Sequence, residues 1–118
     1  MLMLAKQPNT LFIGQSVRFS GTAMYADLEG VPDERRIEFP VCEDLNVGVA
    51  VGLSLQNFLP VVVIPRIDFL LRAADQIVNH LDKLEQMSCC QFKPKVIMRT
   101  RVGSKWPLNP GPHHCQDH

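Results

Sequence analysis

Short apolar runs recur along the first hundred residues, and each is followed by a longer segment of mixed polarity. The runs are residues 10–14 (TLFIG), 36–41 (RIEFPV), 60–65 (PVVVIP) and 95–100 (KVIMRT). Runs of this length that are rich in β-branched and aromatic residues predict strands. The run at 60–65 is almost entirely β-branched and is bounded by prolines, which indicates a strand covered on both faces, as in a parallel sheet.

The segments between the runs show helical periodicity. Residues 20–30 (SGTAMYADLEG) predict a short helix that a serine caps and a glycine ends. The segment that begins at Asp44 repeats apolar and small residues every three to four positions, and Asp44 is the expected cap. Its repeating positions are Leu45, Gly48, Val49, Gly52 and Leu53. Glycines at this spacing indicate that another backbone packs closely against the helix.

A longer amphipathic helix is predicted over residues 68–87, with Asp68 as its cap. Its apolar stripe consists of Leu70, Ala73, Ala74, Ile77, Val78, Leu81 and Leu84. Phe69 is by default a core residue. Asp75 and Asn79 are one helical turn apart, which predicts either an intrahelical hydrogen bond on a solvated face or a functional pair.

Strands alternating with helices predict an α/β fold: a three-layer, mainly parallel sheet with helices on both faces. Ligands of such sheets bind beyond the carboxyl ends of the strands. Three features are expected there: Glu43 after the second run, the PRIDF turn at 65–69, and the tail at 101–118, which contains three histidines and the single tryptophan.

Charge and composition narrow the function classes. The 118 residues include 12 lysines and arginines and 12 acids, so no overall field attracts nucleic acid or a membrane surface. No apolar run approaches the roughly 20 residues that a membrane helix needs. Cys42, Cys89, Cys90 and Cys115 form no C-x-x-C pair, and we interpret them as free thiols of a reducing compartment.

The candidate site residues have ordinary alternatives. Glu43 could satisfy free backbone donors at the start of a helix, or it could be a partly buried carboxylate that shares a proton with a ligand. The tail residues His113, His114, Cys115 and His118 are metal-ligand types without a recognised zinc spacing. We therefore predict no metal site, and keep two alternatives for the histidines, an ordinary loop position or an acid–base contact with a substrate.

Several blocks, taken in order, resemble one family. They are GQSV, FPVCEDLNVGVAVGLSLQNFLPVVV, IDFLLRAADQIVNHLDKLEQM, VIMRT and GPHHCQ. This order is similar to that in the beta subunit of the thiamine-diphosphate-dependent decarboxylating component of 2-oxo acid dehydrogenase complexes, a transketolase-like domain. The resemblance extends from about residue 11 to residue 116.

The resemblance implies a role for particular residues. Glu43 matches the glutamate that hydrogen-bonds a ring nitrogen of the cofactor's aminopyrimidine, which prepares the exocyclic nitrogen to remove the thiazolium proton. Phe69 matches the aromatic residue that packs on the pyrimidine, and Val41 and Pro65 match residues that line the same pocket. His114 matches a histidine near the substrate carboxylate. These positions imply catalytic roles for Glu43 and His114 and cofactor-binding roles for Val41, Glu43, Pro65 and Phe69.

The sequence also departs from the family pattern. Gln15 stands where the family usually has an acid, Phe39 replaces a threonine, Arg66 falls in a turn that is usually aromatic-rich, and Cys115 replaces a serine. The motif that binds diphosphate through magnesium is missing from this sequence. We therefore expect residues 1–118 to be a single, partial pyrimidine-binding domain whose second, C-terminal transketolase-like domain is absent, and to act as a fragment that is inactive alone.

The function implied by the resemblance is oxidative decarboxylation of a 2-oxo acid, of the pyruvate dehydrogenase type, with acyl transfer to a lipoyl group. The implied cofactor is thiamine diphosphate, with Mg²⁺ bound mainly by an alpha-type partner subunit. Further expected partners are a lipoyl-bearing acyltransferase and a second copy of the chain, in the bacterial cytoplasm or an organelle matrix. The alternatives are an enzyme like transketolase or deoxyxylulose-phosphate synthase, and a truncated, non-catalytic interaction module.

Overall fold

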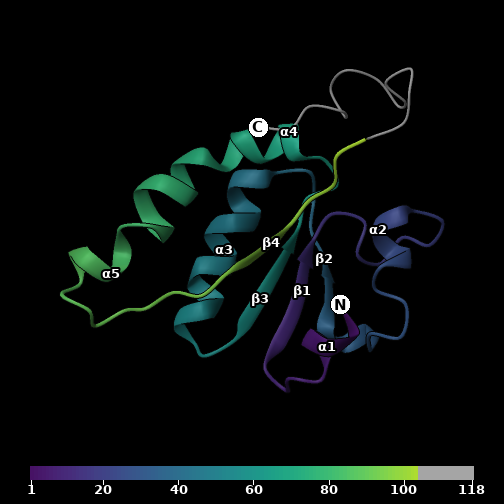
Figure 1. Ribbon diagram of the computed structural model, residues 1–118, viewed down its shortest axis with the longest axis horizontal. Helices are drawn as coiled ribbons and strands as arrows, with labels where there is room; N and C mark the ends of the chain where they lie inside the picture. The colour runs from purple at the N-terminus through teal and green to yellow at the C-terminus, as the bar shows by residue number, and fades with distance from the viewer. Residues whose placement is uncertain (104–118) are drawn as a thin grey trace.

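The computed structural model of the protein describes residues 1–103, which form a parallel four-stranded sheet in the order β2-β1-β3-β4 (Figure 1). The strands are β1 (Thr10–Gly14), β2 (Arg36–Glu38), β3 (Leu59–Val63) and β4 (Ile97–Arg99). Every pairing in this sheet is parallel. The α/β class, the parallel sheet and the four predicted strand positions are therefore confirmed.

Alternation along the two central strands builds a core on each face of the sheet. Phe12, Val61 and Val63 belong to one buried cluster, whereas Ile13 and Val62 belong to the other. All five side chains are at most 2% exposed. Strands covered on both faces need apolar residues at successive positions, which explains the continuous β-branched run of β3.

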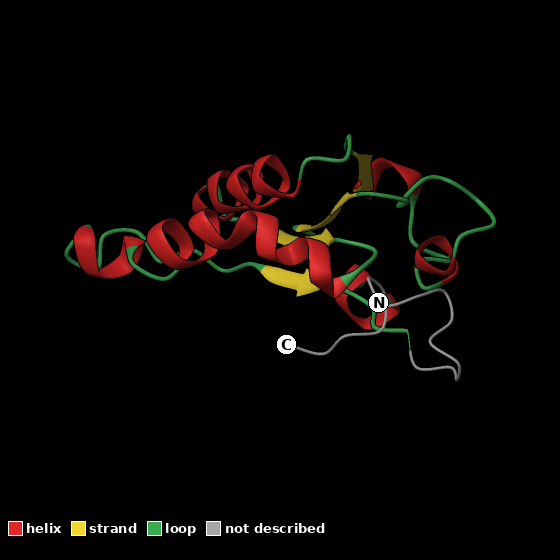
Figure 2. Cartoon of the chain, turned by 90° about the horizontal axis from the view of Figure 1, so that it is seen from above, coloured by secondary structure: helices red, strands yellow, loops and turns green. Residues whose placement is uncertain are grey.

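One face is covered by α3 (Glu43–Leu55) and by a long helical segment that follows β3 (Figure 2). This segment consists of α4 (Ile67–Leu70), the 3₁₀ turn η2 (Leu71–Ala73), the π-helical turn η3 (Gln76–Leu81) and α5 (Leu84–Met87). Its α5 end extends past the sheet (Figure 1). The predicted continuous helix over 68–87 is thus a chain of four shorter pieces.

The opposite face has a thinner cover. It consists of α1 (Leu2–Ala5), α2 (Ala23–Ala26) and the turn η1 (Asp33–Arg35), together with the loops between them. Met24, Leu28 and Val31 from this region are at most 4% exposed and pack on the sheet. The three-layer arrangement is therefore present. Among residues 1–103, no helix combines the length and apolar character needed to cross a membrane.

The predicted helix caps were wrong. Cys42 is the N-cap of α3, so Asp44 lies inside the first turn, and Arg66 rather than Asp68 is the N-cap of α4. Thr22, not a serine, caps α2, because its hydroxyl accepts a hydrogen bond from the Tyr25 backbone N–H at 3.1 Å. A cap is decided by where the backbone leaves the helical conformation, which residue type alone does not set.

The predicted packing of α3 was also partly wrong. Its buried positions are Glu43, Asn46, Val47, Ala50 and Val51, whereas Leu45 is 45% exposed. Neither glycine of the helix contacts another backbone. A Cβ at Gly48 would meet the side chain of Gln76 at 3.2 Å, and one at Gly52 would meet nothing within 4 Å.

The close approach of another backbone, which was expected at the glycines of α3, is found instead at Gly14, the last residue of β1. Its φ is +127°, and a Cβ at this position would lie 2.3 Å from the carbonyl oxygen of Val63. The next residue, Gln15, donates its backbone N–H to the same oxygen at 3.0 Å. The carboxyl ends of β1 and β3 are therefore held tightly together where the chain leaves the sheet.

Candidate functional site

A cleft of about 700 Å³ lies beyond the carboxyl ends of the strands. Its walls come from the segments that follow β1, β2, β3 and β4, and from α2. The lining residues are Gln15, Ser16, Phe19, Thr22, Ala23, Met24, Glu38, Phe39, Pro40, Val41, Pro65, Arg66 and Arg101. From β1 the chain adds β2 on one side of the sheet, and it then adds β3 and β4 on the other side. The cleft lies at this change of side, which is where parallel sheets of this kind bind ligands.

Glu43 is a buried carboxylate next to this cleft. Its side chain is 2% exposed, and its Oε1 accepts a hydrogen bond from Gln15 Nε2 at 3.2 Å. Its Oε2 lies 3.4 Å from Nε of Arg72, whose side chain is 74% exposed. The partners of Glu43 are thus side chains from two other segments. Neither of these partners is a backbone donor of α3, although Glu43 also lies in the first turn of that helix, where the helix dipole favours a carboxylate.

Gln15 connects Glu43 to the cleft. It is 8% exposed, lines the cleft wall, and follows β1 directly. Sequence reasoning had identified Gln15 only as a departure from the family pattern. A polar residue placed just after a buried strand was the signal that could have assigned it to the site.

The other predicted site residues divide into three groups. Val41 and Pro65 line the cleft, and Val41 is 79% exposed. Phe69 does not line it. This ring packs against the core beneath α3, with the Arg66 guanidinium carbon 5.8 Å from its centroid. His114 lies outside the described residues, as do His113, Cys115 and His118.

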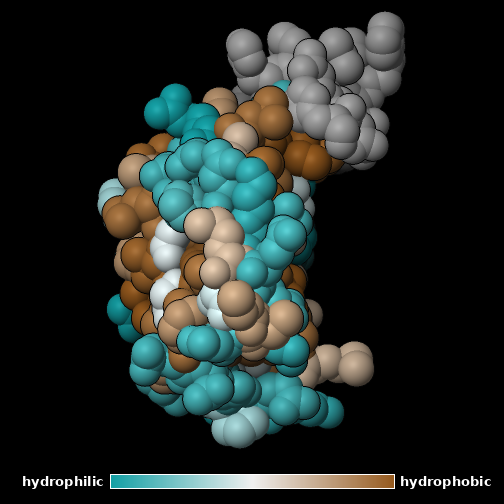
Figure 3. Space-filling view, turned by 90° about the vertical axis from the view of Figure 1, so that its left-hand side faces the viewer, coloured by the Kyte–Doolittle hydropathy of each residue, from teal (hydrophilic) through white to brown (hydrophobic). Residues whose placement is uncertain are grey.

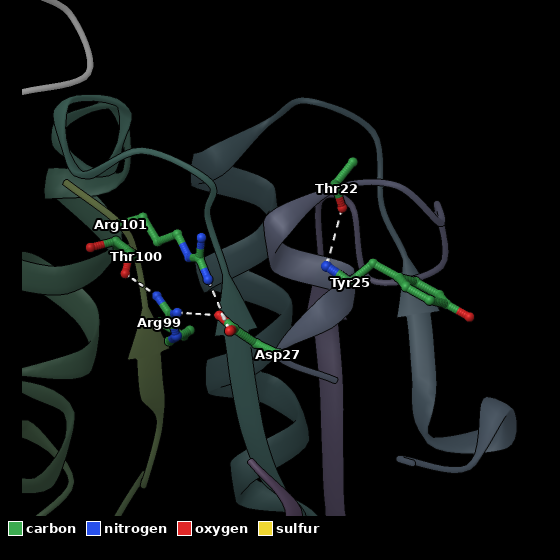
Figure 4. Close-up of polar contacts among 6 residues, drawn as sticks. All are labelled: Thr22, Tyr25, Asp27, Arg99, Thr100 and Arg101. Carbon is green, nitrogen blue, oxygen red and sulfur yellow. Dashed lines mark hydrogen bonds and ion pairs between the residues drawn. The ribbon is translucent and has the colours of Figure 1, made fainter. Parts of the chain in front are cut away.

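The rim of the cleft contains an arginine-rich cluster around Asp27, the C-cap residue of α2 (Figure 4). Arg101 Nη2 lies 2.9 Å from Asp27 Oδ1, and Arg99 forms an ion pair with Oδ2 of the same carboxylate. Figure 4 shows the two guanidinium groups converging on Asp27 from β4 and the residues after it. The pattern of the sequence did not reveal this cluster, because 72 positions separate Asp27 from Arg99.

Glu38 is held by backbone donors at the opposite wall. Its Oε1 accepts the N–H of Ser16 at 2.7 Å, and its Oε2 accepts those of Val17 and Arg18 at 2.8 and 2.9 Å. Ser16 adopts a left-handed conformation, with φ of 60°, that aims these successive N–H groups at one carboxylate. This loop joins the ends of β1 and β2 and shapes one side of the cleft.

A second, apolar groove of about 280 Å³ lies on the helical segment after β3, lined by Ile67, Leu70, Leu71, Ala74, Ile77 and Val78. Leu71 is 60% exposed and Val78 is 52% exposed. Val78 belongs to the predicted apolar stripe, so part of that stripe faces outward. Figure 3, which looks onto the α5 end of the molecule, shows exposed hydrophobic residues between polar ones. Asp75 and Asn79 form the expected intrahelical hydrogen bond, at 2.8 Å.

Within residues 1–103, no group of three or more histidine, cysteine, aspartate or glutamate side chains is placed to hold a metal ion. The described carboxylates of the cleft region have other partners. Glu38 is bound by main-chain N–H groups, Asp27 by arginines, and Glu43 by Gln15 and Arg72. The cleft therefore offers hydrogen-bonding groups and apolar walls.

Comparison with known proteins agrees with this geometry. The chain is 34% identical over 115 residues to the 3-methyl-2-oxobutanoate dehydrogenase subunit beta of Mycobacterium tuberculosis, covering 94% of this chain and 32% of that protein. It is 29% identical over 115 residues to the chloroplastic pyruvate dehydrogenase E1 component subunit beta-3 of Arabidopsis thaliana, covering 94% and 28%. It is 30% identical over 95 residues to the mitochondrial 2-oxoisovalerate dehydrogenase subunit beta of Dictyostelium discoideum, covering 77% and 25%.

The chain thus spans about a third or less of the length of these relatives. A family match covers residues 2–102, which is nearly all of the part that the structure describes. The described fold, the cleft at the strand ends and this match agree with one another. The protein belongs to the transketolase pyrimidine-binding domain family.

Proposed function

We propose that this chain forms the pyrimidine-binding half of a thiamine diphosphate site in a 2-oxo acid dehydrogenase, as a domain of the beta-subunit type. The observation that carries the proposal is the buried carboxylate of Glu43 beside a cleft at the carboxyl ends of β1 and β3. The relatives named above, which are beta subunits of dehydrogenases for pyruvate and branched-chain 2-oxo acids, support it. They favour this reaction class over that of an enzyme acting on sugar phosphates.

The residues present fit an aminopyrimidine. Such a ring is flat, with apolar faces and hydrogen-bonding nitrogens at its edge. The cleft offers apolar surfaces from Val41, Pro65 and Phe39, and Glu43 provides the carboxylate beside them. When bound, thiamine diphosphate supplies the covalent chemistry of decarboxylation.

The proposed work of the protein is to hold and move a proton. Gln15 and Arg72 each contact one oxygen of the Glu43 carboxylate, which restricts its orientation, and Gln15 also lines the cleft. Burial excludes water from Glu43, which strengthens its hydrogen bond to a ligand nitrogen. The Arg66 guanidinium lies over the Phe69 ring, and His114 is proposed to contact the substrate carboxylate.

A complete site would need groups that residues 1–103 lack. We propose that an alpha-type subunit binds the diphosphate and Mg²⁺, and that the product acyl group passes to a lipoyl-bearing acyltransferase. The apolar groove between Ile67 and Val78 is a surface suited to burial against a partner, whether that subunit or a second copy of the chain. The relatives are bacterial, mitochondrial and chloroplastic, which supports a cytoplasmic or organelle-matrix location.

The first test is a calorimetric titration of thiamine diphosphate with Mg²⁺ into the chain, alone and mixed with an alpha-type subunit of a 2-oxo acid dehydrogenase. We expect binding in the mixture and none by the chain alone. An absence of binding in the mixture, with a chain shown to be folded, would contradict the shared site. Turnover of a 2-oxo acid by the chain alone would contradict the half-site.

The second test replaces the carboxylate. In the reconstituted complex, Glu43→Gln is expected to slow exchange of the thiazolium proton of the bound cofactor by roughly 10²- to 10⁴-fold, the usual range for loss of a general acid–base group. The exchange is followed by proton NMR in deuterated water. Glu29→Gln, the same chemical change at an exposed position, is the control. Equal rates of proton exchange in the two variants would contradict the proton-relay role of Glu43.

A further inference from the structure

We propose that Arg66 and Arg101 form an anion subsite at the rim of the cleft, which binds the carboxylate or phosphate group of the substrate. Both residues line the cleft, and Glu38 is the only acid among the lining residues that the structure describes. The proposal rests on the proposed function for the identity of the cleft. It adds the chemical class of the substrate group that this particular chain recognises.

The guanidinium of Arg66 has hydrogen-bond donors available for a ligand. Its side chain is exposed, its guanidinium lies over the Phe69 ring, and no carboxylate among residues 1–103 forms an ion pair with it. An arginine side chain carries five N–H donors in a rigid fork that matches a carboxylate or a phosphate. Stacking on Phe69 restricts the guanidinium, which lowers the entropy lost when an anion binds.

Arg101 is held next to the Arg66 turn by the main chain. The backbone N–H of Ile67 donates to the carbonyl oxygen of Arg101 at 3.1 Å. Through this bond the segment after β4 lies against the segment after β3. The two arginines therefore border the same part of the cleft from neighbouring strands of the sheet.

The local charge balance favours an anion. One carboxylate, Asp27, is shared by Arg99 and Arg101, so the ion-pair cluster carries a net positive charge. Among residues 1–103, Arg101 makes one side-chain hydrogen bond, from its Nη2 to Asp27, which leaves other donors of that guanidinium available. The Arg101 side chain is 40% exposed, so a ligand entering the cleft can reach it.

The acid on the cleft wall opposes an incoming anion only weakly. Both oxygens of Glu38 accept backbone N–H groups, from Ser16, Val17 and Arg18. Three aligned N–H dipoles offset much of the negative potential of a carboxylate. The rim thus presents two guanidinium groups next to apolar walls, a combination suited to a ligand with an uncharged body and an anionic end.

The direct test is a titration of the 118-residue chain with sodium phosphate and, separately, with sodium pyruvate, at constant ionic strength. Binding is followed by the ¹H–¹⁵N amide shifts of Ser16 and Ile67. We expect saturable shifts, and a weakening of about tenfold in Arg66→Gln, the loss expected for one charge-assisted hydrogen bond. Arg66→Lys keeps the positive charge but loses the forked guanidinium, so its affinity for the anion is expected to lie between those of the unchanged chain and Arg66→Gln.

The control is Lys95→Gln, which removes the same charge before β4, in a hollow at the amino ends of the strands. It is expected to change the affinity by less than twofold. Tighter binding of phosphate would identify a phosphate ester as the substrate group, and tighter binding of pyruvate would identify a carboxylate. No saturable shift in a folded chain, or equal losses in Lys95→Gln and Arg66→Gln, would overturn the subsite.

A further comparison separates the substrate from the cofactor. In the complex with an alpha-type subunit, Arg66→Gln is expected to leave the affinity ratio of thiamine diphosphate to thiamine unchanged. A fall in this ratio would assign the arginines to the cofactor's diphosphate and overturn the substrate role. Glu43→Gln is expected to keep phosphate or pyruvate binding, so failure of the proton relay and failure of the anion subsite give different results.

Discussion

Gln15 Nε2 donates a hydrogen bond to Glu43 Oε1 at 3.2 Å, although 28 positions separate the two residues in the chain. Gln15 follows β1 and Glu43 begins α3, so this contact joins the end of a central strand to the start of the helix beside it. Both side chains are buried, at 8% and 2% exposed. A pair of this kind orients the carboxylate before any ligand arrives, which is the condition for a positioned proton-transfer group.

Removing this donor is expected to lower the stability of the fold. Gln15→Ala leaves Glu43 Oε1 buried without its amide partner, and an unsatisfied group of that kind costs about 1–3 kcal/mol. The free energy of unfolding, measured by urea denaturation, should fall by that amount. Gln56→Ala, at an exposed position, is expected to change it by less than about 0.5 kcal/mol. Equal effects of the two changes would contradict the role of the Gln15–Glu43 contact.

The close contact at Gly14 predicts a strong difference between two glycines. Gly14→Ala would place a Cβ 2.3 Å from the Val63 carbonyl oxygen at a positive φ, and should destabilise the fold by about 2–5 kcal/mol. Gly52→Ala lies in a helix with nothing within 4 Å, and should stabilise it by about 0.5–1 kcal/mol. Thermal unfolding followed by circular dichroism compares them. A tolerated Gly14→Ala would show that the ends of β1 and β3 are less closely held.

Asn46 is a second buried polar residue on α3, and the proposed function does not use it. It is fully buried, and neither Nδ2 nor Oδ1 has a hydrogen-bond partner among the described residues. Asn46→Leu removes two unsatisfied groups and keeps a side chain that branches at Cγ, so the free energy of unfolding should rise by about 1–2 kcal/mol. Urea denaturation measures the change. A loss of stability would show that the amide has a partner in the folded protein in solution.

The apolar groove predicts a surface needed for association. Val78→Asp puts a charge at a position that is 52% exposed, so the fold should tolerate it. Association with an alpha-type subunit or with a second copy, measured by sedimentation, should weaken by about tenfold, because a charge would be buried at the contact. Met87→Asp, at a position 74% exposed outside the groove, is the control. Unchanged association of Val78→Asp would exclude this groove as the interface.

Strand positions were predictable because each depends on local sequence. The β-branched run that ends at Ile64 predicts a strand covered on both faces, and the structure confirms it. Helix detail was less predictable. The segment over 68–87 has a helical stripe, yet it forms a π-helical turn at Gln76–Leu81, and Val78 of the stripe faces outward. Which face of a helix is buried depends on its neighbours, since periodicity defines a stripe but not what covers it.

The candidate site was likewise only partly predictable from the sequence. Glu43, Val41 and Pro65 were identified from the sequence through family resemblance, and the structure places all three at or beside the cleft. Phe69 lies under the Arg66 guanidinium and does not line the cleft, and its contact with the cofactor stays a prediction, as does the role of His114. The Asp27 cluster could not be predicted, because its members come from α2 and from the segment around β4.

By itself, the sequence determined the alternation of strands and helices, the parallel character of the sheet, and the family resemblance that singles out Glu43. These follow from short-range patterns of apolar residues and from motifs within single segments. Only the tertiary structure decided that Gln15 is the partner of Glu43, that Gly14 brings β1 against β3, and that two arginines border one cleft. Each of these is a contact between segments distant in sequence, and such contacts exist only once the chain has buried its core and closed its loops.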